Sequence, residues 1–256
     1  MKVSIITVSF NAYGTIRDTL KSVAEQDYPD IEYIVMDGAS TDGTLDIIRE
    51  YGSHIAQFVS EPDGGIYDAM NKAWKLATGD LVGFIHADDF FSDPSCIRRI
   101  VEAQQVSGAD IVFADVAMVA ADDTTKLVRF YSPQGFNLSW LKQGYAPPFP
   151  GIYCRRELFD KFGGYDVQYP LAGDFDWLAR ILFVHKTNYA ILPYTVVKMR
   201  VGGKSSGIRS NIQGYREIAR SCKINGVPAT PLTLMSRFFS KALQYSIFQR
   251  GGKVPV

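Results

Sequence analysis

Apolar runs alternate with helical segments through residues 2–91, and this alternation restricts the fold more than any other feature of the chain. Four runs rich in Val, Ile and Leu have the character of buried strands: 2–9, 31–36, 55–60 and 81–85. The segments between them have helical spacing and helix-start residues such as Asp42. Strands that alternate with helices through short connections favour an α/β fold with a mostly parallel sheet.

Polar or glycine-rich residues follow each of these strands. The four groups are Ser9-Phe10-Asn11, Asp37-Gly38, the turn at 61–65, and Asp88-Asp89. The carboxyl ends of parallel strands meet at one edge of a sheet, and open α/β sheets bind ligands beyond that edge. The sequence therefore predicts a ligand site built from these four groups.

The fourth group has the composition of a metal site. Asp88 and Asp89 are adjacent carboxylates, and a divalent cation relieves the repulsion between them. Carboxylate oxygens suit Mg²⁺ or Mn²⁺, and Mg²⁺ usually shares its shell with substrate phosphates. These residues predict a metal–diphosphate site. The alternative is a polar loop in which Asp89 or Asp93 caps the helix that begins near Pro94.

The second half of the chain is less regular. It predicts strands at 110–114 and 151–154, a hairpin of 116–119 with 127–131, a shaped loop at 135–150, a helix at 174–183 and an interrupted strand at 189–199. We expect a first domain at 1–205, divided into a nucleotide-binding half (1–115) and an acceptor half (116–205). Residues 206–256 are expected to form a basic amphipathic helical tail, with helices near 208–225 and 231–249.

The charge of the chain is balanced overall but uneven along its length. From Lys198 onward there are eleven basic residues and one acid, Glu217, which gives +10 and leaves −10 on residues 1–197. This asymmetry predicts an anionic membrane surface as the partner of the tail, and packing on the domain or a homodimer contact are the alternatives. The whole chain is neutral, so no nucleic-acid partner is expected.

The N-terminus and the cysteines bear on the cellular compartment. The apolar run after Met1 is too short for a secretory signal, and no run has the length of a membrane-spanning helix. The three cysteines are far apart and odd in number, which disfavours a disulfide framework. We expect a cytoplasmic protein, peripheral on the inner face of the membrane if the tail binds there.

Several motifs, in order, resemble those of family 2 glycosyltransferases with the GT-A fold. They are V-S-I-I-T-V-S-F-N at 3–11, I-V-M-D-G-A-S-T-D-G-T at 34–44, S-E-P-D-G-G-I-Y-D-A-M-N-K at 60–72, H-A-D-D at 86–89, R-R-E-L-F-D-K-F-G-G-Y-D at 155–166 and G-D-F-D-W-L-A-R at 173–180. Their sequences are most similar to the corresponding motifs of bacterial enzymes that build cell-surface polysaccharides. The resemblance implies a nucleotide-binding sheet and a nucleoside-diphosphate-sugar donor, with UDP favoured by the family's tendency and GDP or dTDP also suited.

The resemblance also implies a role for individual residues. It assigns nucleotide binding to Ser9, Phe10, Asn11, Asp37, Asp63, Gly64, Asn71, His86 and Asp88, and metal binding to Asp88 and Asp89. Within that set, Asp37 would hold the base and Phe10 would stack on it. Asp174 matches the general base that removes the proton of the acceptor hydroxyl. Three positions differ from the family pattern: Gly173 replaces the usual acid before the base, His86 replaces Asp or Asn, and Met70 replaces the Arg that many members carry before Asn71.

These features imply an inverting, metal-dependent transfer of a sugar to a hydroxyl of a glycan or a lipid-linked glycan. Simpler roles remain open: Asp37 as a strand-to-turn cap, Phe10 as core, and Asp174 as an N-cap. A sugar-nucleotide nucleotidyltransferase would need a Gly-rich basic loop after the first strand, and an oxidoreductase would need G-x-G-x-x-G there. Neither is present. A non-catalytic nucleotide-sugar binder would differ from the enzyme in lacking turnover.

Overall fold

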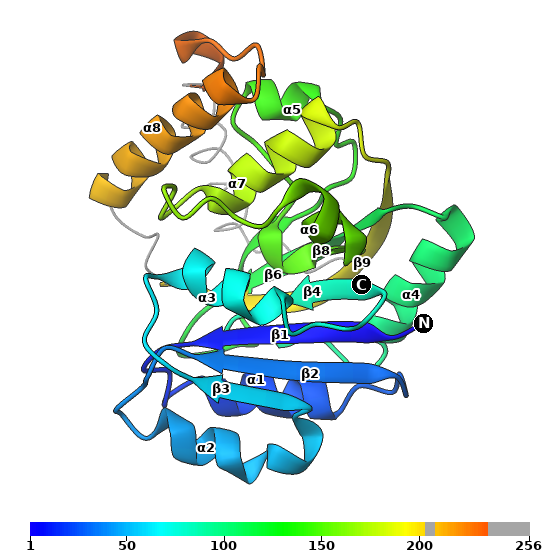
Figure 1. Cartoon of the computed structure of the whole chain (residues 1–256), viewed down its shortest axis with the longest axis vertical. Coiled ribbons are helices and arrows are strands. Elements are labelled where there is room, and N and C mark those ends of the chain that lie inside the picture. Colours follow the sequence, from blue (N-terminus) through cyan, green and yellow to red (C-terminus); the bar gives the residue numbers. More distant parts are fainter. Residues whose placement is uncertain (203–207, 235–256) are drawn as a thin grey trace.

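The computed structural model of the chain describes residues 1–202 and 208–234, which form a mixed sheet with helices on both faces (Figure 1). Its strands are β1 (Val3–Ser9), β2 (Ile31–Asp37), β3 (Gln57–Ser60), β4 (Leu81–Phe84), β5 (Asp89–Phe91), β6 (Ile111–Val119), β7 (Leu127–Tyr131), β8 (Ile152–Arg155) and β9 (Tyr189–Arg200). Its α-helices are α1 (Ile16–Ala24), α2 (Thr44–Glu50), α3 (Ile66–Trp74), α4 (Cys96–Ser107), α5 (Ser139–Lys142), α6 (Glu157–Phe162), α7 (Gly173–Leu178) and α8 (Ile208–Ile224).

The strand order across the sheet is β3-β2-β1-β4-β8-β6-β9-β5, with β7 beside β6. β1 to β4 are mutually parallel, and β8 is antiparallel to both β4 and β6. β6 therefore runs in the direction of β4, and β9 is parallel to β6. The predicted mostly parallel α/β sheet is confirmed, and the carboxyl ends of β1, β2, β3, β4 and β6 share one edge.

Two apolar layers hold the helices against the sheet. β1 and β2 are almost entirely buried because their apolar side chains alternate between the two faces. One face packs on α1, α2 and α4, and the other packs on α3, α6, α7 and α8. Figure 1 shows α1 and α2 on one side of the sheet and α3, α6 and α7 on the other.

The structure differs from the sequence-based expectation in four places. The segment 135–150, expected to be a loop, contains α5. Residues 111–119 form one strand rather than two, with a register shift at Asp115 where β6 pairs with β9. Residues 89–91, for which the sequence predicted no strand, form β5 because they pair with 197–199 of β9. The helix expected at 174–183 is α7 followed by a π-helical segment, Ala179–Val184.

The predicted tail is described as far as residue 234. α8 packs on the domain through the buried side chains of Ile218 and Cys222. Most of the second predicted tail helix lies outside the described residues. Over the described ranges, no helix combines the length and the apolarity that crossing a bilayer requires.

Glu32 links the starts of β1, β2 and β4 at the amino edge of the sheet. Its buried carboxylate accepts hydrogen bonds from Ser4 Oγ (2.6 Å), from the backbone N–H and the hydroxyl of Thr78 (both 2.7 Å), and from Lys2 Nζ (2.9 Å). Burial alone would raise the pKa of Glu32, but these donors outweigh it and lower the pKa to about 2. The charged form of Glu32 therefore stabilises the folded state.

We expect Glu32→Gln to lower the free energy of unfolding at pH 7 by about 3 kcal/mol. The folded pKa lies below the unfolded one, so this stabilisation is present above about pH 4.5 and is lost as the pH falls towards 2. Urea unfolding at pH 7 and pH 3 measures this stabilisation, and the difference in the free energy of unfolding between variant and wild type should be smaller at pH 3. Glu50→Gln, at an exposed ion pair, is the control, and an equal gap at both pH values would contradict the assignment.

Candidate active site

The carboxyl ends of β1, β2 and β3 meet at Asp37. Ser9, Asp37 and Ser60 lie side by side in register on the three strands. The buried Asp37 carboxylate accepts hydrogen bonds from Ser9 Oγ and Ser60 Oγ (both 2.9 Å), and from the backbone N–H (2.8 Å) and hydroxyl (2.5 Å) of Ser40. Four donors match the acceptor capacity of a carboxylate. Asp37 and Ser9 thus hold the strand ends together, and the predicted contact between Asp37 and a base would require one of these bonds to break.

Phe10 and Asp63 flank a single glycine above this point. A Cβ atom at Gly38 would lie 2.5 Å from Asp63 Oδ2 and 3.2 Å from Phe10 Cδ2, so a larger residue would collide with the carboxylate. Phe10 is 53% exposed although it is aromatic. An exposed ring can stack on a planar base, and a carboxylate beside the ring can accept hydrogen bonds from the N–H groups of that base. The structure thus brings Phe10 and Asp63 together, as nucleotide binding requires.

Two loops shape the surroundings of this pair. Asn11 adopts a left-handed backbone (φ 48°), donates its N–H to Ser40 Oγ (2.8 Å), and accepts the Thr41 N–H at Oδ1 (2.9 Å). Gly64 donates its N–H to Asp68 Oδ2 (2.9 Å) in the turn that leads into α3. Asn11 and Gly64 therefore fix the loops that carry Phe10 and Asp63.

His86 and Asp88 lie on the turn between β4 and β5, and Asp89 is the first residue of β5. The His86 ring stacks on Phe149, with centroids 5.4 Å apart and planes at 15°. Burial lowers the pKa of His86 although the Asp88 charge opposes this effect, so the imidazole is neutral at pH 7. Asp88 is half-buried and reaches solvent, whereas Asp89 is only 1% exposed.

Of the two carboxylates, Asp88 is the one that can reach a divalent cation from solvent. Burial raises the pKa of Asp89 well above its usual range, and the neighbouring Asp88 charge raises it further. Asp89 Oδ1 is buried and has no hydrogen-bond partner among the described residues. No group of three or more His, Cys, Asp or Glu side chains suited to a metal occurs in 1–202 or 208–234. An ion here would rely on Asp88 together with phosphate oxygens and water, which is how Mg²⁺ is commonly bound.

Arg200 holds this turn, a role that no local sequence pattern indicated. Its partly buried guanidinium donates from Nη1 to the Asp88 carbonyl (2.9 Å), forms an ion pair with Asp18 of α1, and lies 4.8 Å from the centre of the Phe90 ring. On the other side, Thr19 Oγ1 donates to the Asp89 carbonyl (2.6 Å). The β5–β9 pairing that positions Arg200 joins segments more than a hundred residues apart, as 89 pairs with 199.

Asn71 connects α3 to the segment that precedes α7. Its Nδ2 donates to the Tyr165 carbonyl (2.7 Å), and its Oδ1 accepts the Tyr165 N–H (2.9 Å). A Cβ atom at Gly164 would lie 2.2 Å from Asn71 Oδ1, which explains the glycine there. The amide of Asn71 is thus occupied by protein contacts, and its predicted nucleotide contact stays a prediction.

Asp174 reaches the same edge of the sheet by a different route. It is the second residue of α7, and its Oδ1 accepts a hydrogen bond from the hydroxyl of Tyr67 (3.1 Å). Tyr67 lies in the first turn of α3, which begins directly after the loop from the carboxyl end of β3. Asp174 therefore lies at the carboxyl edge of the sheet, where Phe10, Asp63 and Asp88 also lie.

α8 fixes the start of α7 through buried polar groups. Glu217 Oε2 accepts the backbone N–H groups of Leu171 and Ala172, both at 2.9 Å. Ser221 Oγ (2.7 Å) and Asn225 Nδ2 (2.9 Å) donate to Asp176 Oδ1 one turn further on. The single acid of the basic C-terminal segment thus supports the helix that carries the predicted base.

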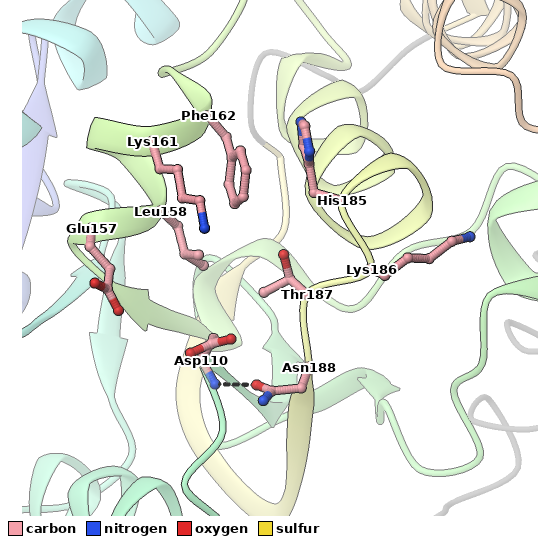
Figure 2. A pocket seen from close by; sticks show the side chains of 9 residues that line it. All are labelled: Asp110, Glu157, Leu158, Lys161, Phe162, His185, Lys186, Thr187 and Asn188. Carbon is pink, nitrogen blue, oxygen red and sulfur yellow. Dashed lines mark hydrogen bonds between the residues drawn. The ribbon is translucent and has the colours of Figure 1, made fainter.

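A pocket of about 310 Å³ lies elsewhere, beside α6 and the start of β9 (Figure 2). Asp110, which precedes β6, and Asn188, which precedes β9, are bonded to each other there (backbone N–H to Oδ1, 2.6 Å). β6 and β9 start at the amino edge, opposite the carboxyl ends of β1 to β4. None of the predicted site residues lines this pocket.

Residues 4–162 match the model of the family "Glycosyl transferase family 2". The chain belongs to this family. An uncharacterized glycosyltransferase of Mycobacterium tuberculosis is 36% identical over 184 residues, which cover 71% of this chain and 69% of the relative. A PGL/p-HBAD biosynthesis glycosyltransferase of Mycobacterium bovis is 30% identical over 181 residues, covering 69% and 68%. The chain is therefore a glycosyltransferase homologue, as the motifs predicted.

Two solved structures share the GT-A fold with this glycosyltransferase homologue. Staphylococcus aureus TarS (residues 1–349), in complex with UDP, superposes with a TM-score of 0.64 at 20% identity and covers 86% of this chain. The match spans 65% of that longer chain. A mannosyltransferase of Pyrobaculum calidifontis, in complex with GDP-Man and Mn²⁺, gives a TM-score of 0.62 at 18% identity, covering 97% and 82%.

Proposed function

We propose that this family 2 member is an inverting, metal-dependent glycosyltransferase. It takes a nucleoside-diphosphate-sugar and transfers the sugar to a hydroxyl of a glycan or lipid-linked glycan in cell-surface polysaccharide synthesis. One observation carries the proposal: Asp174, bonded to Tyr67 at the start of α3, lies at the same sheet edge as the Phe10–Asp63 pair and Asp88. A base, a nucleotide platform and an anionic ligand for a cation are the parts that such a transfer requires.

In this proposal Phe10 stacks on the base of the donor and Asp63 accepts its N–H groups. Asp88, with the buried Asp89 behind it, would hold Mg²⁺ or Mn²⁺. A cation there neutralises charge on the departing diphosphate. Arg200 and Thr19 hold the backbone of this turn and so orient Asp88.

Asp174 takes the proton of the acceptor hydroxyl as that oxygen attacks the anomeric carbon. The new carbon–oxygen bond forms as the bond to the diphosphate oxygen breaks, and the nucleoside diphosphate leaves with that electron pair. One displacement inverts the anomeric configuration and needs no covalent intermediate. A single displacement needs no nucleophile from the enzyme, which agrees with a site whose predicted catalytic group is one carboxylate.

The comparisons support a nucleotide-sugar donor without choosing its base. TarS structures contain UDP or UDP-GlcNAc, and the P. calidifontis mannosyltransferase contains GDP-Man with Mn²⁺. The M. bovis relative, whose name places it in PGL/p-HBAD biosynthesis, supports a lipid-linked acceptor. The +10 charge of residues 198–256 supports action beside an anionic membrane on the cytoplasmic side.

The test is turnover of UDP-GlcNAc and of GDP-mannose with Mn²⁺, with octyl glycosides or water as acceptors. We expect nucleotide release above the rate without protein for one donor, and a product of inverted anomeric configuration by NMR. Nucleotide binding without any sugar release would contradict the enzyme and favour a non-catalytic binder. A product with retained configuration would contradict the mechanism.

A further inference from the structure

Gly173 and Tyr67 form a matched pair beside the predicted base. A Cβ atom at Gly173 would lie 2.9 Å from one carbon of the Tyr67 ring and 3.0 Å from two others, which is tighter than nearly all real Cβ contacts. The ring therefore fills the space that a side chain at 173 would need. The position that precedes the predicted base carries no side chain because Tyr67 approaches the backbone of α7 there.

We propose that Tyr67 is a positioning residue for Asp174: its hydroxyl orients the carboxylate of the base, and Gly173 makes room for it. This inference rests on the proposed function, because it takes Asp174 as the base. The Tyr67 hydroxyl, which comes from α3, takes the place beside Asp174 that a side chain at position 173 of α7 would otherwise have. The orienting group is neutral, so it adds no negative charge beside the base.

The surroundings of Tyr67 make its hydroxyl a fixed donor. The side chain is buried in the apolar core, and its ring lies 5.6 Å from that of Tyr165. Burial raises the pKa of Tyr67 well above its usual range, and the Asp174 charge contributes, so the phenol stays protonated. A protonated phenol donates to a carboxylate, and the 3.1 Å distance between Tyr67 Oη and Asp174 Oδ1 is within hydrogen-bonding range.

Both partners of this hydrogen bond are held by separate elements. Asn71, one turn further along α3, bonds twice to the backbone of Tyr165. Glu217 of α8 binds the two N–H groups that precede Gly173. A donor and an acceptor that are each anchored in this way lose little entropy when they meet, which is how a carboxylate is kept in one rotamer.

The experiment compares Tyr67→Phe with wild type in the donor turnover assay. Removing only the hydroxyl should lower kcat by roughly 10- to 100-fold, the scale of a misplaced catalytic group. The KM for the donor and the Kd for the nucleotide should stay unchanged, because the substitution removes only the hydroxyl that bonds to Asp174. Tyr153→Phe is the matched control: its hydroxyl is also buried and has no partner among the described residues. An unchanged kcat in Tyr67→Phe would overturn the inference.

A double-mutant cycle separates this inference from the proposed function. If Asp174→Asn removes activity and Tyr67→Phe adds no further loss in that background, the two residues act together. Full activity of Asp174→Asn would instead refute the base assignment itself. If the fold losses in kcat of the two single variants multiply in the double variant, Tyr67 acts independently of Asp174. That result would overturn this inference and leave the proposed function standing.

A crystal structure of Tyr67→Phe provides a test that does not depend on turnover. We expect the backbone of α3 and α7 to superpose on wild type and the Asp174 side chain to occupy more than one rotamer. A single, unchanged Asp174 rotamer in the variant would contradict the inference even if no donor were found.

Discussion

Asp174→Asn should lower kcat by about 10²- to 10⁴-fold, the contribution of a general base, while nucleotide binding is retained. The amide has the size of the carboxylate and can still accept from Tyr67, so the local hydrogen bond is preserved. It cannot take up the proton of the acceptor hydroxyl. Steady-state turnover and nucleotide titration of the same preparation measure the two properties separately.

Asp160→Asn is the control for that substitution. Asp160 lies on α6, where its carboxylate pairs with Arg156 at the surface. We expect wild-type turnover from this variant. A parallel loss of turnover and nucleotide affinity in Asp174→Asn would mean that Asp174 belongs to the donor site, and the base would have to be sought elsewhere.

Asp88→Asn should weaken Mn²⁺-dependent nucleotide binding by roughly 100-fold, at the upper end of what losing a supporting partner does at metal sites. Of the two adjacent carboxylates, Asp88 is the one that reaches solvent. The amide keeps the backbone contact from Arg200 and removes only the charge. Calorimetry with and without Mn²⁺ measures the loss.

The matched control is Asp30→Asn, an exposed carboxylate that precedes β2 at the amino edge of the sheet. It removes the same charge at the edge opposite Asp88 and should leave binding unchanged. Equal affinities of Asp88→Asn and wild type in Mn²⁺ would show that the ion, if bound, is not held by Asp88.

The first half of the fold was predictable because its information is local. Each of β1, β2, β3 and β4 is an apolar run of strand length, and each ends in residues that leave the sheet. The parallel arrangement follows from the helices between them. The grouping of Phe10 with Asp63 could be predicted for the same reason, because parallel strands end at a common edge.

The remainder depends on contacts between distant segments. β5 is a strand only because residues 197–199 lie beside it, and Arg200 reaches Asp88 only through that pairing. The four donors around Asp37 were also hidden, since Ser9, Ser40 and Ser60 come from three separate segments. Gly173 stood out in the sequence as a departure, but its physical reason, the Tyr67 ring, lies more than a hundred positions away.

Calorimetric titration of the full chain with UDP, GDP and dTDP, each with and without Mn²⁺, tests the proposed nucleotide-sugar site. We expect one of these nucleotides to bind with an affinity that rises when Mn²⁺ is present, and Phe10→Ala to weaken this binding. The nucleotide that binds would also name the base of the donor. If none of the three bound with or without the metal, the nucleotide-sugar site at the carboxyl edge of the sheet would be refuted.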